Sequence, residues 1–272
     1  MNHPQATARV VVGIDGSQAA INAALWAVAE AVSRNVPLRL VHAIQDRPAD
    51  ATGDDGMEVE YAQASLRAAD AALQATGKPV QVECDIVRGC PEGILVDESR
   101  SAAMICVGSV GIGRIARKLL GSTADAVARK AQCPVAVVRS NGHKSDAGWV
   151  AVVVDDSPAN DAVLEEGFRE ARLRRAPILA LGVWRWGLGE VPYRQLEHRL
   201  GRWVSRYPEV HVMPAAARRG PAEFLAHTQE SVQLTVVGNE DADKLARMVG
   251  PAGPHLTGPA GCSVLVARGR TI

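Results

Sequence analysis

The chain contains two copies of one sequence pattern, and this repetition constrains its architecture more than any other feature. The segment RVVVGIDGS, which ends at Ser17, returns as VAVVVDDS, which ends at Ser157, at an offset of 140 residues. The segment CPVAVVR, which begins at Cys133, returns as CSVLVAR, which begins at Cys262, at an offset of 129 residues. Because the landmarks keep their order, each copy is expected to form a complete domain.

Two domains also suit the length of 272 residues, since one domain usually takes roughly 100–200 residues. The polar stretch SNGHKSDAG at residues 140–148 has the composition of a linker. We therefore predict domains at residues 1–143 and 144–272. With 47% hydrophobic residues overall, each can bury its own core without disulfides or metals.

The charge balance argues against binding to nucleic acid or membranes, and the cysteine content indicates a reducing compartment. The 30 basic and 30 acidic side chains cancel, which removes any overall attraction to nucleic acid or to an anionic membrane. No run approaches the ~18 apolar residues of a membrane span. The five cysteines are odd in number and form no CxxC pair, and the N-terminus lacks the pattern of a signal peptide. The sequence therefore predicts a reduced, cytoplasmic protein that binds neither nucleic acid nor membrane.

Short apolar runs alternate with longer segments of helical period in each copy. The runs are continuous, as strands buried on both faces require. In the first copy the predicted strands are 10–14, 38–44, 80–87, 103–107 and 135–139, with helices at 17–34 and 57–76. Each copy is thus predicted to be an α/β domain, a five-stranded, mostly parallel sheet with helices on both faces. Ligands of such sheets lie at the carboxyl ends of strands, and Asp15, Val41 and Gly108 fall at or near such ends.

A glycine motif follows the fourth predicted strand of the first copy. From Gly108 to Ser122 it spells G-x2-G-x9-G-S, and a helix is expected at 124–131. It is neither a P-loop nor the GxGxxG fingerprint, but glycines and a helix N-terminus let backbone N–H groups approach phosphate oxygens. Arg114, Arg117 and Lys118 lie inside the motif without an acid. The motif therefore favours a polyanion, although charge runs are also common on solvated surfaces.

With VVGIDGS, LVHA, RGCPEGIL, the glycine motif and the closing CPVAVVR, the chain resembles the universal stress protein family, in its tandem-domain, ATP-binding branch. The resemblance covers essentially the whole chain. It implies a Rossmann-like fold, similar to adenine nucleotide alpha hydrolases, with strand order 3-2-1-4-5 and ATP at the switch point. It also implies that Asp15 lies near the sugar and phosphates and that the backbone of Val41 reads adenine. By the same resemblance, ribose and phosphates would be held by Gly108, Gly111, Gly121, Ser122 and Thr123.

Each of these residues also has a structural interpretation. The glycines could serve tight strand exits, and Ser122 could cap the following helix. Asp15 could be a turn residue beside Gly16. As a ligand of a triphosphate, Asp15 needs a ribose hydroxyl or a bridging Mg²⁺, because a lone carboxylate would repel the phosphates. The sequence leaves both choices open.

The second copy departs from the motif. Asp241 stands in the place of Gly111, and Pro251 stands where the first copy has Ser122. Proline lacks the N–H and the hydroxyl of the serine, and the prolines and glycines at 251–259 interrupt any following helix. We therefore predict that the second copy is a degenerate partner that does not bind ATP in the family manner. A cation or another ligand in its acidic pocket is the alternative.

Catalytic signatures are missing from the sequence. The seven histidines show no zinc spacing, and no nucleophile triad or water-activating carboxylate pair can be identified. Cys106 is expected to be a core thiol, and His42 either approaches the nucleotide or simply packs at a strand end. The leading hypothesis is an ATP-binding regulatory or sensor protein without an evident catalytic apparatus. The alternatives are a slow Mg²⁺-dependent ATP hydrolase and a nucleotide-independent scaffold. A homodimer and an unidentified protein partner are expected by analogy with the family.

Overall fold

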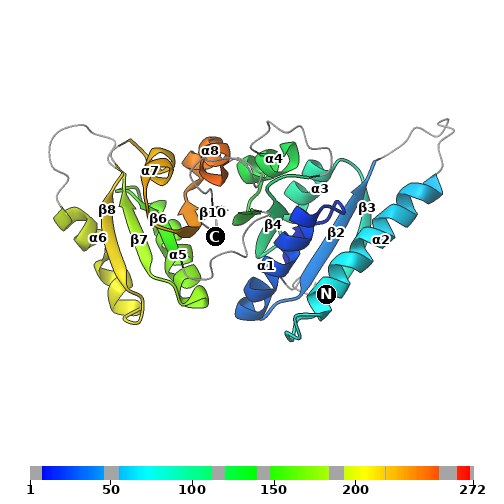
Figure 1. The fold of residues 1–272 in the computed structure, drawn as a ribbon, viewed down its shortest axis with the longest axis horizontal. Coiled ribbons are helices and arrows are strands. Elements are labelled where there is room, and N and C mark those ends of the chain that lie inside the picture. Colours follow the sequence, from blue (N-terminus) through cyan, green and yellow to red (C-terminus); the bar gives the residue numbers. More distant parts are fainter. Residues whose placement is uncertain are drawn as a thin grey trace, which may run out of the picture. The chain divides into compact units, whose positions relative to one another are not determined.

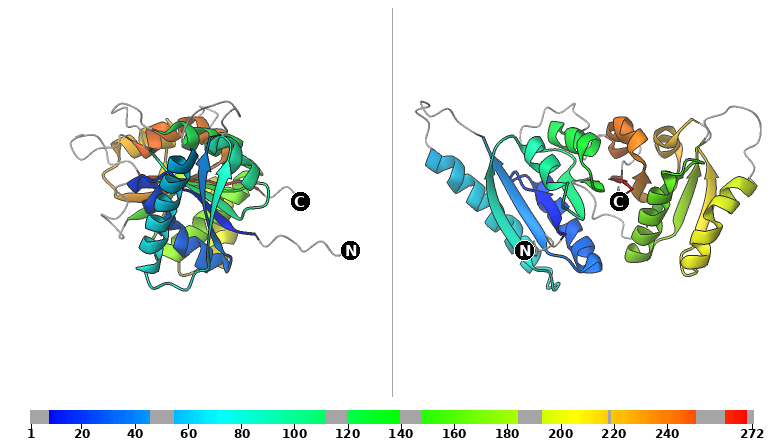
Figure 2. Two further views of the ribbon diagram at one scale, coloured as in Figure 1. Left: turned by 90° about the vertical axis from the view of Figure 1, so that its right-hand side faces the viewer. Right: turned by 180° about the vertical axis from the view of Figure 1, so that it is seen from behind.

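The computed structural model describes residues 8–45, 55–111, 120–139, 148–183, 193–217, 219–250 and 262–269. The chain divides into two compact units, Met1–Ser140 and Asn141–Ile272 (Figure 1). Each unit has a parallel sheet with helices on both of its faces, as Figure 2 shows from two further sides. The predicted α/β fold with a mostly parallel sheet is therefore confirmed.

The strands of the first unit pair in parallel in the order β3-β2-β1-β4-β5. Helices α1 and α2 pack together on one face, and α3 and α4 pack together on the other. The order reverses at β1, which lies between β2 and β4, so the switch point is at the carboxyl ends of β1 and β4. The elements are β1 (Val10–Gly13), α1 (Gln18–Arg34), β2 (Leu38–Ile44), α2 (Asp55–Gln74), β3 (Val82–Arg88), α3 (Pro91–Glu98), β4 (Met104–Gly108), α4 (Ser122–Lys130) and β5 (Val135–Val138).

The apolar runs of the sequence account for the central strands. Val10, Val11 and Val12 of β1 are at most 1% exposed, because helices cover both faces of the strand. The predicted strand at 80–87 begins instead at Val82, since the N–H of Val80 donates to the carbonyl of Lys78 in a turn. The helix predicted at 124–131 begins two residues earlier, at the start of α4.

The second unit repeats this arrangement, with parallel strands in the order β8-β7-β6-β9-β10. Helices α5 and α6 lie on one face of its sheet. The segment after β9 folds as a short 3-10 helix and then α8, and α7 packs against α8. The elements are β6 (Trp149–Val154), α5 (Asn160–Arg174), β7 (Ile178–Gly182), α6 (Tyr193–Arg206), β8 (Val212–Ala216), α7 (Pro221–His227), β9 (Val232–Val237), η1 (Asn239–Lys244), α8 (Leu245–Val249) and β10 (Ser263–Val266).

Candidate functional site

The turn between β1 and α1 holds Asp15 at the carboxyl end of β1. The N–H of Ser17 donates to Asp15 Oδ1 at 2.9 Å, and the Ser17 hydroxyl accepts the N–H of Ala20 at 3.2 Å as the N-cap of α1. The Tyr61 hydroxyl, from α2, donates to the carbonyl of Asp15 at 3.2 Å. One carboxylate oxygen of Asp15 therefore has the turn role that the sequence left open.

Glycine is required at two places near this turn, for different reasons. Gly16 has φ +86°, and a Cβ atom there would collide with the Tyr61 hydroxyl. Gly108, at the end of β4, lies against the first turn of α1: a Cβ atom on it would lie 2.7 Å from the carbonyl carbon of Ala19. Close packing of α1 on β4 is thus a sufficient reason for glycine at position 108.

The residue that follows β4 and the residue that precedes α4 are joined by a backbone hydrogen bond. The N–H of Gly121 donates to the carbonyl of Ser109 at 2.9 Å. Gly121 is the N-cap residue of α4, so Ser122 is the first helical residue and does not cap it, and no side chain in the described segments caps this helix. Thr123 follows in the first turn, where N–H groups lack helical acceptors. Sequence reasoning overlooked Ser109, which is 1% exposed and whose hydroxyl has no hydrogen-bond partner among the described residues.

Asp15, Gly111 and Gly121 come together although they are far apart in sequence. A Cβ atom on Gly111 would lie 2.5 Å from Asp15 Oδ2, and a Cβ atom on Gly121 would lie 3.8 Å from the N atom of Gly111. Gly111 does not have a positive φ, so its backbone alone does not demand glycine. The space beside the Asp15 carboxylate does. The Asp15 carboxylate and the N-terminus of α4, which carries the positive end of the helix dipole, thus both lie near the backbone of Gly111.

The position of Val41 bears on which backbone groups are available to a ligand. Val41 lies inside β2, and its carbonyl accepts the N–H of Ile14 at 2.9 Å. Residues of a strand face alternate neighbours, and Ile44 faces β3, because its carbonyl accepts the N–H of Gly89 at 2.9 Å. Ala43 therefore faces β1, beyond the point where the β1–β2 ladder ends among the described residues. Counting in steps of two from Val41 could have identified Ala43 from the sequence.

His42 lies beside the same turn, on the α2 side of β2. It is 6% exposed, and its ring meets that of Tyr61 edge to face with centroids 5.9 Å apart. Burial lowers the pKa of His42, and the Asp15 carboxylate opposes part of this effect. The ring is therefore neutral near pH 7 and does not neutralise Asp15.

The structure describes only some of the other residues that the sequence singled out. Arg114, Arg117, Lys118 and Pro251 lie outside the described residues. Cys106 is fully buried in β4, as predicted for a core thiol. Within the described residues, no group of three or more histidine, cysteine or acidic side chains is arranged to hold a metal ion.

The second unit repeats the turn but not its surroundings. The N–H of Ser157 donates to Asp155 Oδ1 at 2.8 Å, as in the first copy. The neighbouring helix supplies a charged donor instead of a tyrosine: Arg199 Nη2 donates to the carbonyl of Ser157 at 2.8 Å and pairs with Asp161 at 2.7 Å. An Asp in this turn is therefore shared by both copies and does not by itself indicate a ligand.

At the place of Gly111, the second unit has a carboxylate. Asp241 lies in η1, is 6% exposed and pairs with Lys244 at 2.7 Å. A Cβ atom on Gly238, the counterpart of Gly108, would lie 2.7 Å from the Glu240 carboxylate. Acidic side chains thus occupy the region after β9 whose counterpart in the first unit is lined by glycine.

Fold and site together define a tandem, doubly wound α/β protein whose first copy carries a glycine-rich loop at the switch point. The model of the universal stress protein family matches residues 7–139. Universal stress protein Rv2624c of Mycobacterium tuberculosis is 52% identical over 262 residues, covering 95% of this chain and 96% of that protein. Universal stress protein Rv2028c of the same species is 38% identical over 98% of both chains. The chain belongs to the universal stress protein family.

A solved structure agrees with the fold. A universal stress protein from Archaeoglobus fulgidus matches 96% of this chain and 98% of its own, with a TM-score of 0.65 at 15% identity, which supports the fold alone. A universal stress protein in complex with cAMP is 31% identical and covers 50% of this chain and 99% of its own, with a TM-score of 0.42. None of the helices in the described segments has both the length and the apolar composition needed to cross a membrane.

Proposed function

We propose that the first unit binds ATP at the carboxyl ends of β1 and β4, and that the chain is an ATP-binding regulatory or sensor protein. The observation that carries the proposal is the contact of the Asp15 carboxylate with the glycine-lined backbone that leads into α4. A nine-residue helix whose first turn has no side-chain cap from the described part of the chain suits phosphate oxygens. The missing Cβ atom at Gly111 leaves room for the Asp15 carboxylate, and the missing Cβ atom at Gly121 keeps the backbone at the start of α4 open to such a group.

Three groups would share the nucleotide between them. The N–H and hydroxyl groups of Ser122 and Thr123 would donate to phosphate oxygens. Asp15 Oδ2 would accept from a ribose hydroxyl or hold a bridging Mg²⁺. The peptide group of Ala43, which faces past the end of β1, would offer one donor and one acceptor to the edge of adenine. This geometry favours Ala43 over Val41, whose carbonyl already accepts a hydrogen bond from Ile14.

Ser122 allows a sharp test because the second copy suggests the substitution. Ser122 is the first residue of α4, where proline is tolerated, and the preceding Gly121 has φ −69° and ψ 149°, which is compatible with a following proline. Ser122→Pro should therefore keep the helix but remove one N–H and one hydroxyl donor. Ser122→Ala, the matched control, removes only the hydroxyl.

Calorimetric titration of the full chain with ATP should rank wild type, Ser122→Ala and Ser122→Pro in falling order of affinity. A hydrogen bond to a charged group contributes about 1.5–3 kcal/mol, so Ser122→Pro should bind at least about tenfold more weakly than Ser122→Ala. Circular dichroism and thermal melting check that the fold is kept. Equal affinity of the two variants would contradict phosphate binding at the start of α4.

The same titration distinguishes ligands and sites. We expect one ATP per chain, because acidic side chains occupy the corresponding region of the second unit. Titration with and without Mg²⁺ tells whether Asp15 acts through a metal, and cAMP provides a competing adenine nucleotide without a triphosphate. Two ATP per chain would refute the asymmetry, and the absence of any heat under varied conditions would favour the nucleotide-independent scaffold.

Turnover is tested separately. A sensor should release phosphate from ATP negligibly, and Asp15→Asn should change affinity more than it changes phosphate release. Robust phosphate release by the wild type that disappears in Asp15→Asn would favour a hydrolase instead.

A further inference from the structure

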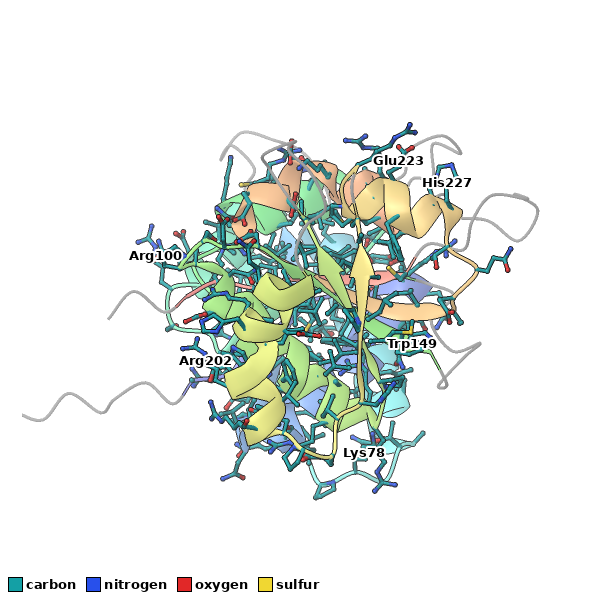
Figure 3. All side chains as sticks on the ribbon, turned by 90° about the vertical axis from the view of Figure 1, so that its left-hand side faces the viewer. Lys78, Arg100, Trp149, Arg202, Glu223 and His227 are labelled. Atoms are coloured by element: carbon teal, nitrogen blue, oxygen red, sulfur yellow. The ribbon has the colours of Figure 1, made fainter. Side chains whose placement is uncertain are left out.

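The second unit carries a surface that the first unit lacks. At the C-terminal ends of α5 and α6, arginines and aromatic rings alternate. The guanidinium groups of Arg202 and Arg206 lie over the ring of Trp203, at 5.1 and 5.9 Å from its centroid. Those of Arg172 and Arg206 lie over the ring of Tyr207, at 5.2 and 5.5 Å. We call Arg172, Arg202, Trp203, Arg206 and Tyr207 the Arg–aromatic ladder. Figure 3 looks onto α6 and labels Arg202 at the side of this helix.

The rings of the ladder are anchored in the core. Phe168 of α5 is fully buried and contacts both Trp203 and Tyr207, with centroids 6.0 and 5.5 Å apart. Trp203 and Tyr207 are only 6% and 5% exposed. A guanidinium stacked on a fixed ring loses less side-chain freedom when it binds a ligand than a free arginine does. The ladder therefore presents its cations in fixed orientations.

Two of these cations have no acidic partner within the described part of the chain. Arg202 pairs with Asp161, whereas no ion pair is formed there by Arg172 or Arg206, and both are exposed. Helix C-termini favour cations, which explains one basic residue per helix end but not the stacking of two arginines on one ring. Glu209, in the turn after α6, is the acid that follows in sequence, and it does not pair with either of them.

The first unit is an internal control for this surface. Its sequence counterparts of Arg172, Arg206 and Tyr207 are Val32, Thr76 and Gly77, and the counterpart of Trp203 is Leu73. The helix packing is shared, since Leu73 is 2% exposed and packs in the core just as Trp203 does. The fold therefore does not require the ladder.

We propose that the Arg–aromatic ladder is a docking surface for an acidic segment of a partner protein. Planar guanidinium groups match carboxylates in a bidentate geometry, and two of them on one ring can engage neighbouring carboxylates of an acidic peptide. The ladder lies at the amino-terminal end of the strands, opposite to the end where Asp155 lies, because α5 and α6 run back from there. This inference does not depend on nucleotide binding by the first unit.

Nucleic acid fits this surface less well than an acidic peptide. Bases need an open aromatic face for stacking, and both rings of the ladder are buried beneath guanidinium groups. Nucleic-acid binders also neutralise several phosphates in a row, whereas this surface offers two unpaired cations on a chain of net charge zero.

Fluorescence polarisation of a labelled oligoglutamate peptide tests the proposal with the full chain. Wild type should bind at low ionic strength and more weakly as salt is added. The double variant Arg172→Gln with Arg206→Gln should lose about tenfold or more in affinity, while Arg172→Lys with Arg206→Lys, which keeps the charge but not the planar fork, should lose less. The matched control is Arg100→Gln with Arg219→Gln, which removes two exposed arginines that lie elsewhere and should change affinity by less than about twofold.

Each result bears directly on the proposal. Absence of peptide binding by the wild type would overturn it, as would a loss in the control variant equal to the loss in the Arg172 and Arg206 variant. Stronger competition by a single-stranded oligonucleotide than by unlabelled oligoglutamate would replace the acidic peptide with nucleic acid as the partner. Thermal melting of all variants establishes that the losses arise in a folded protein.

Discussion

Placing the acid of the second copy into the first, by Gly111→Asp, should largely abolish ATP binding. A Cβ atom at position 111 would lie 2.5 Å from Asp15 Oδ2, so the Asp15 carboxylate must shift and the new carboxylate remains near it. A carboxylate about 4 Å from a phosphate charge repels it by roughly 4 kcal/mol at an effective dielectric constant of 20. Gly111 is exposed, and salt screens part of this repulsion. The expected loss in ATP affinity is roughly 2–4 kcal/mol, or about 30- to 1000-fold.

The size of the new side chain must be separated from its charge. Gly111→Asn has the same shape as Gly111→Asp but carries no charge, so the difference between the two measures electrostatic repulsion of the phosphates. Gly201→Asp adds the same charge on α6, where a Cβ atom meets nothing within 4 Å, and should leave ATP affinity unchanged. Calorimetry at two salt concentrations completes the design, because higher salt should reduce the difference between the Asp and Asn variants.

Two outcomes would refute this reasoning. If Gly111→Asp bound ATP as wild type does, the nucleotide would not lie between Asp15 and α4. If the Asp and Asn variants were equally weak at both salt concentrations, the requirement for glycine would be spatial and the acidic character of the second copy would not explain its predicted failure to bind.

Three further predictions concern stability and reactivity. Gly108→Ala should lower the free energy of unfolding by about 1–3 kcal/mol, because the added methyl group meets the backbone of α1. Gly201→Ala, on an open helix surface, should raise it by about 0.5–1 kcal/mol. Urea unfolding measures both changes. Burial lowers the pKa of His42, so the unfolded chain binds a proton at this histidine before the folded protein does as the pH falls below about 6.5. His42→Asn should therefore lose less stability than wild type on acidification. Urea midpoints at several pH values measure the difference. Burial is the main cause that raises the pKa of the Cys84 thiol, and the carboxylates of Asp70 and Asp85 raise it further. Asp70→Asn should therefore speed the alkylation of Cys84 by iodoacetamide at about pH 8. An unchanged rate, measured by mass spectrometry, would contradict this.

The parts of the fold that the sequence predicted well are those fixed by continuous burial. The run LRLVHAI became β2 with the predicted bounds, because a strand covered on both faces needs a nearly continuous apolar run, and no residue of β2 is exposed. The ends of strands and helices that depend on a single backbone hydrogen bond were harder to predict from the sequence. The start of β3 depends on the turn at Val80, and the start of α4 depends on Gly121 taking the N-cap position without a side-chain partner.

Contacts between residues of the candidate site could not be predicted from the sequence, because they join residues that are far apart along the chain. The spacing of Gly108 and Gly111 suggested one shared role, but their surroundings separate them. Gly108 makes room for a helix of its own domain, whereas Gly111 makes room beside a carboxylate. Tyr61 left no signal because the loop length between β2 and α2 does not fix which turn of the helix reaches Asp15, and its hydrogen bond joins residues 46 positions apart.

Comparison of the two copies separates residues that the fold needs from residues that a ligand would need. The aspartate turn after the first strand is present in both copies, with N–H to carboxylate distances of 2.9 and 2.8 Å, so selection for the fold alone can maintain it. The copies differ at the position after the fourth strand, where the first has Gly111 and the second has Asp241. A fold that tolerates an acid at this place does not require glycine there for stability. The glycine of the first copy is therefore better explained by what that copy binds, just as the Arg–aromatic ladder, which the first copy folds without, is better explained by what the second copy contacts.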